Sequence, residues 1–232
     1  KYFLGTIAII LITCTSCKVT KYVPAGHYLL DKVSIKNDNK GLSDTDFSIY
    51  LRQRPNTKLF NFINFNLGLY SLSGRVTTQW INRFLQKIGD APVIYDSLAT
   101  VASANELKKV MNNKGYTNAQ VETDIVFKNK KAKVTYNITS NDPYRIKDFK
   151  YRIKDAEIAE IVLNDSASSL IKEGKLFDID VLEKERIRVS NLLRNNGYIY
   201  FDKEYVGFLA DTTAGGKMVN LSMVVRPMRK IT

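Results

Sequence analysis

Apolar and polar residues alternate over 121–127 and again over 132–138, on either side of a polar turn at 129–131. Strict alternation is typical of strands with one buried face, so this stretch predicts a β-hairpin. A similar pair of runs lies at 205–209 and 219–225. Two alternating sets fit the first strand of this second hairpin, one being Tyr205, Gly207 and Leu209 and the other their neighbours Val206 and Phe208.

A helix is predicted before each hairpin. The expected caps of the two helices are Ser103 with Glu106 and Asp180 with Glu183. Each helix ends at a glycine that a tyrosine follows. Gly115-Tyr116 matches Gly197-Tyr198 at a separation of 82 residues (197 minus 115). This register indicates an internal repeat in which each unit reads strand, helix, helix, hairpin.

The first unit is the longer one. A strand at 33–35 and a helix at 43–51 are followed by an irregular apolar segment at 56–74 and by a second helix over 79–88. The apolar face of that second helix holds Trp80, Phe84, Leu85 and Ile88. The segment at 56–74 either packs as an insertion or binds something. We expect it to pack, because its eight apolar side chains would otherwise form a patch larger than monomers usually expose.

The first residues of the chain have the pattern of an export signal. Lys1 precedes an apolar run over 3–13, which is too short to span a bilayer as a helix but suits the core of a secretory signal. Small residues then lead into Cys17, as in bacterial lipoprotein signals that are cleaved just before an acylated cysteine. We therefore expect a signal peptide over 1–16 and a diacylglycerol or other acyl lipid on Cys17. Acylation of Cys14 instead, or an ordinary signal peptide, are the alternatives.

Acylation of Cys17 has two consequences for the mature chain. Cleavage before Cys17 removes Cys14, so no disulfide can form. Two or three acyl chains on one residue make a stable membrane anchor, whereas one chain binds only marginally. The sequence thus predicts a globular protein held at a membrane by a tether over 17–27. Because the sequence starts without Met, we also expect further residues before Lys1.

The net charge of the chain restricts the classes of binding partner that are expected. The formal net charge is +12, which in a cytosolic protein would favour nucleic acid. Export makes nucleic acid an unsuitable partner, and lipid head groups or an acidic protein surface are expected instead. A lysine-rich solvated surface without any partner is the alternative.

No pattern of catalytic or metal-binding residues stands out. His27 is the only histidine and lies in the predicted tether, which excludes a histidine-based triad and a multi-histidine metal site. Four acidic residues gather at one predicted helix start, where the helix dipole favours them and basic residues lie among them. These four are Asp178, Asp180, Glu183 and Glu185. We expect no enzyme activity, no cofactor and no metal site.

The repeat resembles the polypeptide-transport-associated (POTRA) domain of the BamA/TamA outer-membrane assembly superfamily. The order of elements and the two Gly-Tyr pairs carry the resemblance, with Pro143-Tyr144-Arg145-Ile146 between the units. The chain is also similar to the lipid-anchored TamA-like branch, the TamL-like translocation and assembly module lipoproteins. The motifs behind this finer resemblance are Lys21-Tyr22-Val23-Pro24, Gly26, Tyr28-Leu29-Leu30, Leu51 to Asn56 and Pro92 to Asp96. Asp90-Ala91 departs from the pattern, in which a Glu-Pro-like pair is expected before Pro92.

The resemblance implies an α+β fold of tandem POTRA domains. Each domain would have β-α-α-β-β order, with a mixed three-stranded sheet and its helices on one face. The first domain would span 28–141 with an insertion at 56–90, the second would span 142–228, and 229–232 would begin a link. Members of the superfamily end in a sixteen-stranded outer-membrane barrel, so a further POTRA domain and a barrel are expected beyond Thr232.

The resemblance also implies a function. The chain would be periplasmic, anchored by lipid to the inner leaflet of the outer membrane, and would bind unfolded outer-membrane proteins for assembly or translocation. Client strands would add to a free sheet edge, which is expected to be the first strand of each hairpin. The candidate edge residues are Val121, Thr123, Ile125, Phe127, Tyr205, Gly207 and Leu209. The alternative is a structural spacer that docks a partner, such as a TamB-like periplasm-spanning subunit, without direct client binding.

Overall fold

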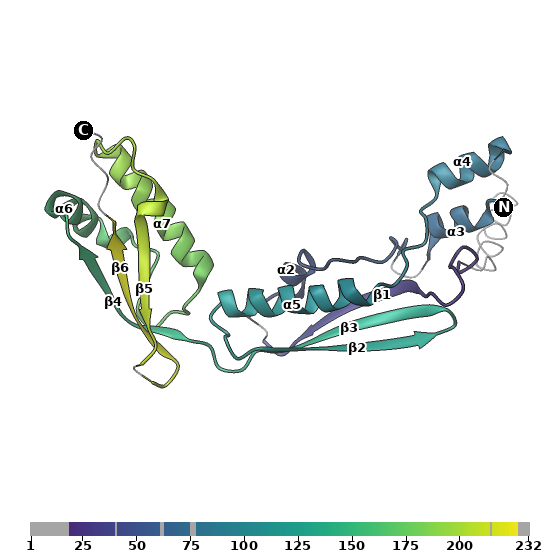
Figure 1. The fold of residues 1–232 in the computed structure, drawn as a ribbon, viewed down its shortest axis with the longest axis horizontal. Helices are drawn as coiled ribbons and strands as arrows, with labels where there is room; N and C mark the ends of the chain where they lie inside the picture. The colour runs from purple at the N-terminus through teal and green to yellow at the C-terminus, as the bar shows by residue number, and fades with distance from the viewer. Residues whose placement is uncertain (1–18, 40, 61–62, 75–77, 214, 227–232) are drawn as a thin grey trace, which may run out of the picture. The chain divides into compact units, whose positions relative to one another are not determined.

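The computed structural model describes residues 19–39, 41–60, 63–74, 78–213 and 215–226 (Figure 1). Their internal contacts divide the chain into two compact units, and the segment 108–120 groups with the second of them. We refer to each unit by its sheet and describe every helix with the sheet that it precedes or follows in the chain. Each unit contains one three-stranded sheet, with strand order β1-β3-β2 in the first and β4-β6-β5 in the second. The two orders are equivalent, so the units share one topology. The predicted acylation site Cys17, its alternative Cys14 and the predicted link at 229–232 lie outside the described residues.

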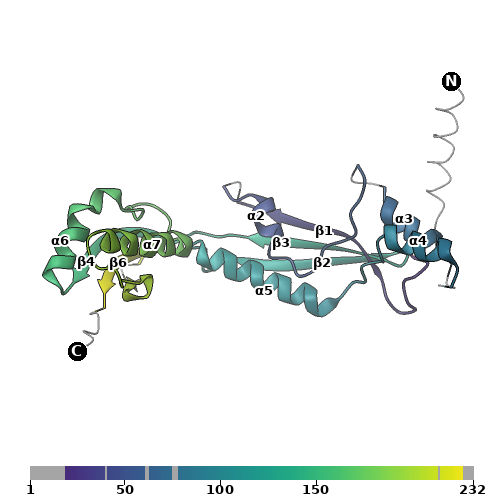
Figure 2. The same ribbon diagram turned by 90° about the horizontal axis from the view of Figure 1, so that it is seen from above.

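The first unit combines one sheet with four described helices. Its strands are β1 (Leu29–Asn37), β2 (Gln120–Lys128) and β3 (Lys131–Thr139), and its helices are α2 (Asp44–Ser48), α3 (Phe65–Leu72), α4 (Trp80–Ile88) and α5 (Ser97–Asn113). β1 runs parallel to β3, and α5 lies along the sheet (Figure 2). The apolar residues of β3 point to this helix and are buried. The hydroxyl of Tyr136 in β3 donates a hydrogen bond to the carbonyl of Thr100 in α5, at 3.4 Å.

The second unit repeats this arrangement. Its strands are β4 (Arg145–Ile153), β5 (Val206–Asp211) and β6 (Met218–Val225), its α-helices are α6 (Ala156–Asn164) and α7 (Ile179–Asn195), and its 3-10 helices are η1 (Ser166–Ser168) and η2 (Lys203–Tyr205). β6 pairs parallel with β4 and antiparallel with β5. Ile158 and Val162 of α6 and Val189 and Leu193 of α7 are buried in one cluster with Met223 of β6. Both helices therefore cover the same face of the sheet.

The tandem α+β fold predicted from the sequence is confirmed, but two helix starts were wrong. α5 begins at Ser97, six residues before the predicted cap Ser103. The hydroxyl of Ser103 lies inside the helix, where it donates to the carbonyl of Ala99 at 2.7 Å. The carboxylate of Asp96 caps α5 by accepting from the Leu98 amide at 2.7 Å.

The N-cap of α7 also differs from the predicted residue. Asp178, rather than the predicted Asp180, is its N-cap, and its carboxylate accepts a hydrogen bond from the Asp180 amide at 2.8 Å. Asp178 follows Asp96 by 82 residues, the separation already found for Gly115 and Gly197. The repeat thus includes the helix start as well as the helix end.

The predicted insertion at 56–90 contains α3 and α4 and is closed at its base. The side-chain amide of Asn56 donates to the carbonyl of Ala91 at 2.7 Å and accepts from the amide of Val93 at 3.0 Å. The expectation that 56–74 packs was right for Leu67, which is fully buried, but wrong for Phe60 and Phe65, which are exposed. Of the predicted apolar face of α4, Trp80, Phe84 and Ile88 are exposed as well, whereas Leu85 is half-buried.

Candidate functional site

Each sheet has one edge that is partly closed and one that is open. β1 is bridged at its start by Ile94, and the Leu30 amide donates to the Val93 carbonyl at 2.8 Å. β4 is bridged in the same way by Leu176. β2 and β5 lie at the opposite edges, where no other described strand pairs with them. The two open edges are therefore β2 and β5, the first strands of the hairpins.

The turn of the first hairpin decides which residues of β2 face outward. Asn129 and Lys130 both have positive φ, 50° and 61°, which is the geometry of a two-residue type I′ turn. Such a turn places Lys128 and Lys131 opposite each other as a hydrogen-bonded pair. Because hydrogen-bonded and free positions alternate along an antiparallel strand, every second residue of β2 turns its N–H and C=O away from β3. These outward positions are the predicted residues Val121, Thr123, Ile125 and Phe127.

Side chains next to this free backbone form a partly apolar rim. Val121 and Thr123 are half-buried, whereas Ile125 and Phe127 are exposed. The Phe127 ring lies 4.3 Å from the ring of Tyr28 and 5.4 Å from that of Tyr95, measured between centroids. An extended segment that pairs with β2 would therefore meet an aromatic surface at one end of the strand.

In β5, the residues that turn their backbone groups away from β6 are not the set predicted for the second hairpin. The Arg226 amide donates to the carbonyl of Tyr205 at 2.8 Å, which makes this a hydrogen-bonded pair in the β5–β6 register. Gly207 and Leu209 therefore also turn their backbone groups towards β6. Tyr205 itself belongs to η2 rather than to the strand. The outward positions are Val206, Phe208 and Ala210, the first two of which belong to the alternative set.

One of these outward positions is already partly occupied. The carbonyl of Val206 accepts a hydrogen bond from Nε of Arg186 at 2.8 Å. Phe208 and Ala210 keep outward backbone groups, so the open part of β5 is shorter than that of β2. Sequence alternation could not find this phase, because both sets of β5 residues contain apolar side chains.

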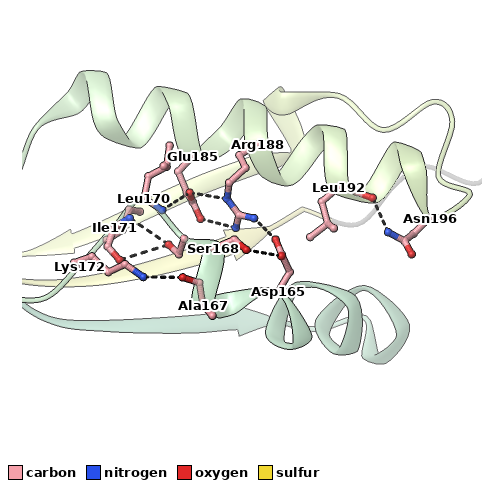
Figure 3. Close-up of polar contacts among 11 residues, drawn as sticks. Asp165, Ala167, Ser168, Leu170, Ile171, Lys172, Glu185, Arg188, Leu192 and Asn196 are labelled. Carbon is pink, nitrogen blue, oxygen red and sulfur yellow. Dashed lines mark hydrogen bonds and ion pairs between the residues drawn. The ribbon is translucent and has the colours of Figure 1, made fainter.

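The acidic cluster of the second unit is a network of ion pairs. Glu183 binds Lys203 at 2.5 Å and Arg186 at 2.8 Å. Glu185 is fully buried, and Arg188 lies between it and Asp165 (Figure 3). Glu183 and Glu185 thus each have basic partners that explain their positions.

The surroundings of Glu185 favour its charged form. Burial by itself raises the pKa of this carboxyl group, but hydrogen bonds from Arg188 and from the Leu170 amide, at 2.9 Å, outweigh burial and leave the pKa below its usual value.

Among the described residues, no three His, Cys, Asp or Glu side chains come together as metal ligands would. His27 is exposed, with Nδ1 3.0 Å from the carbonyl oxygen of Ala25. No helix in the described part of the chain has both the length and the apolar character needed to cross a bilayer.

The family comparison matches the first unit. The family model "POTRA: Surface antigen variable number repeat" matches residues 28–141. Residues 28–141 form a POTRA domain. The second unit has the same strand order and helix placement, so the chain contains the POTRA fold twice. No curated protein is similar in sequence to this chain.

Several solved POTRA structures are similar to the chain. POTRA3-5 of BamA from Haemophilus influenzae is 15% identical, with a TM-score of 0.43, over 90% of this chain and 70% of that one. BamA from Haemophilus ducreyi lacking POTRA domains 1-3 is 11% identical, with a TM-score of 0.42, over 87% of this chain and 30% of that one. POTRA1-2 of the periplasmic domain of Omp85 from Anabaena is 9% identical, with a TM-score of 0.37, over 88% and 98%. The chain thus spans less than a third of the length of the second of these structures.

Proposed function

We propose that this chain is the periplasmic POTRA region of an outer-membrane protein assembly or translocation factor of the BamA/TamA superfamily. It receives unfolded client strands, or a strand of a partner subunit, at the open edge of β2. The observation that carries the proposal is the outward backbone of Val121, Thr123, Ile125 and Phe127, next to the aromatic rim around Phe127. Backbone hydrogen bonds give affinity for any extended segment, so one edge can accept many clients.

Membrane attachment is the second part of the proposal. Acylation of Cys17 would hold the first POTRA domain at the inner leaflet of the outer membrane, as in the TamL-like branch. The support comes from the sequence, in which an apolar run and small residues precede Cys17. The intact mass of the protein extracted from membranes tests this part. A mass that includes acyl chains, and that Cys17→Ala reduces by those chains, is the expected result.

The geometry of β5 favours a different role for the second POTRA domain. The open part of β5 is short because Arg186 already occupies the Val206 carbonyl. This observation supports the alternative function for that unit, a spacer that docks a fixed partner such as a TamB-like subunit without binding clients.

Crosslinking distinguishes the two roles. A photoreactive residue at Glu122, which is exposed on β2, is expected to crosslink to many nascent outer-membrane proteins. The same label at Leu209 on β5 is expected to give one partner or none. Thr123→Pro removes one outward N–H and fills the edge, so it should abolish the crosslinks from Glu122. Unchanged crosslinking and assembly in Thr123→Pro would contradict client binding at β2.

A further inference from the structure

The first described residues of the chain are fixed to α3. Nζ of Lys21 donates hydrogen bonds to the carbonyls of Ser71 at 3.1 Å and Ser73 at 2.7 Å. The hydroxyl of Tyr22 donates to the same Ser73 carbonyl at 2.5 Å. These bonds attach the predicted tether to the C-terminal end of α3, inside the insertion.

Apolar packing adds to this attachment. Val23 and Leu67 of α3 are buried in one cluster, and Val19 packs against it. One residue separates Val19 from Cys17 in the sequence, and an extended chain covers at most about 3.6 Å per residue. An acyl group on Cys17 would therefore hold Val19 within about 7 Å of the acylated residue, and α3, against which Val19 packs, would lie close to the anchor. The insertion is the part of the first domain that the anchor brings to the membrane.

α4 packs on α3. Its side around Asn82 is buried and Leu85 next to it is half-buried, whereas its other apolar side chains turn outward. Trp80 is 71% exposed and Phe84 53%, and Ile81 and Ile88 are exposed as well. At 100° per residue these four side chains lie within one helix face, which we call the α4 face. The buried residue of the helix is Asn82, on the opposite side. α4 is thus amphipathic, with its apolar side unpartnered in the described part of the chain.

The charged side chains of α4 itself, Arg83 and Lys87, are both basic, and the first acidic residue after the helix is Asp90, whose carboxylate accepts a hydrogen bond from Asn66 at 3.3 Å. Residues 56–89 contain four basic residues and no Asp or Glu, although a quarter of the whole chain is charged. Arg83 and Lys87 are exposed and border the α4 face on the helix. Long basic side chains beside tryptophan and phenylalanine are typical of helices that lie in the interface of a bilayer. The basic residues can reach the head groups while the apolar residues enter the acyl boundary.

We infer that the α4 face binds the surface of a bilayer that contains anionic phospholipid. The inference rests on the proposed acylation of Cys17, because the tether brings α3 and α4 to the membrane. Binding of the α4 face adds a second membrane contact to the acyl anchor and fixes the orientation of the first POTRA domain against the bilayer. The absence of acidic residues from 56–89 favours a negatively charged lipid surface as the occupant.

The fluorescence of Trp80 tests this contact directly, because Trp80 is the only tryptophan of the sequence. The acylated chain is reconstituted into vesicles of phosphatidylglycerol and phosphatidylethanolamine, with and without brominated acyl chains. Brominated lipid is expected to quench most of the Trp80 emission. The double variant Phe84→Asp with Ile88→Asp should lose this quenching. The matched control Ile199→Asp changes a 72% exposed isoleucine of the second unit and should keep it.

The mass of the same sample separates this inference from the proposed function. If Cys17 carries acyl chains and Trp80 is not quenched, the inference is overturned. If Cys17 carries none, the proposed anchor fails, and the chain is then mixed with the brominated vesicles from solution. Quenching that disappears in the double variant would still support binding of the α4 face to lipid, and a lack of quenching would overturn it.

Discussion

Glu185 of α7 is fully buried and receives two hydrogen bonds from Arg188, one turn further along the same helix. Oε2 accepts from Nε at 3.0 Å and Oε1 from Nη2 at 2.9 Å. The same guanidinium reaches Asp165, so one arginine joins α7 to the end of α6 (Figure 3). A buried carboxylate with this many partners stabilises the unit only as long as all of them remain.

Glu185→Gln should therefore destabilise the protein. The substitution leaves Arg188 partly buried without its main counter-ion, and breaking a buried pair from one side costs about 3 kcal/mol or more. The free energy of unfolding in urea measures the loss. Glu183→Gln is the matched control on the same helix, because its side chain is 37% exposed and such pairs contribute at most about 1 kcal/mol. Equal losses in the two variants would contradict this account.

The stability of the second unit should also depend on pH through Glu185. Its pKa is lowered in the folded state, so its contribution is fully present above the unfolded value of about 4.3 and is lost as the pH falls through the folded pKa. We expect the melting temperature to fall more steeply below pH 4 in the wild type than in Glu185→Gln. Parallel curves for the two proteins would show that Glu185 does not titrate in this way.

Proline substitutions test the phase of β2. The N–H of Thr123 points away from β3, so Thr123→Pro removes no ladder hydrogen bond, whereas Asp124→Pro removes one and leaves a carbonyl of β3 unpaired. The free energy of unfolding should be lower in Asp124→Pro than in Thr123→Pro by about 2 kcal/mol. Urea titration of both variants measures the difference. A lower free energy of unfolding in Thr123→Pro would mean that the N–H of Thr123, rather than that of Asp124, points towards β3.

The corrected phase of β5 has its own test. Ala210 points its N–H outward and Leu209 points its N–H towards β6, where it faces Ser222. Ala210→Pro should be tolerated, while Leu209→Pro should destabilise the second unit by about 2 kcal/mol more. Thermal unfolding followed by circular dichroism compares the two variants. If Ala210→Pro destabilised the unit more than Leu209→Pro, the outward positions would instead belong to the set that includes Leu209.

Gly197 ends α7 with a backbone conformation that side chains disfavour. Its φ is 97°, and an added Cβ would meet no atom within 4 Å. Gly197→Ala should therefore lower the free energy of unfolding by about 1–2 kcal/mol through backbone strain alone. Gly68→Ala is a control of opposite sign, because Gly68 lies inside α3 with free space around it and alanine favours helix by about 1 kcal/mol. Destabilisation by both variants would point to lost space rather than strain.

Patterns that act over a few residues predicted much of the fold. The alternation over 121–127 and 132–138 gave β2 and β3, because a strand with one buried face has a period of two. Helix starts were less accurate. Ser103 with Glu106 has the spacing of a capping box, yet Ser103 is buried inside α5 because its hydroxyl can bond a carbonyl of the preceding turn.

The sequence by itself determined the repeated order of elements, because the alternating strands and the helix-ending Gly-Tyr pairs that recur at 82 residues depend on local sequence. It also determined that β2 residues at odd positions share one face. Only the tertiary structure decided that β5 uses Phe208 and Ala210 at its edge, since this phase depends on pairing with a strand across a turn. The tertiary structure likewise decided that the apolar face of α4 points outward, because helical spacing shows which side chains share a face but not what packs against that face.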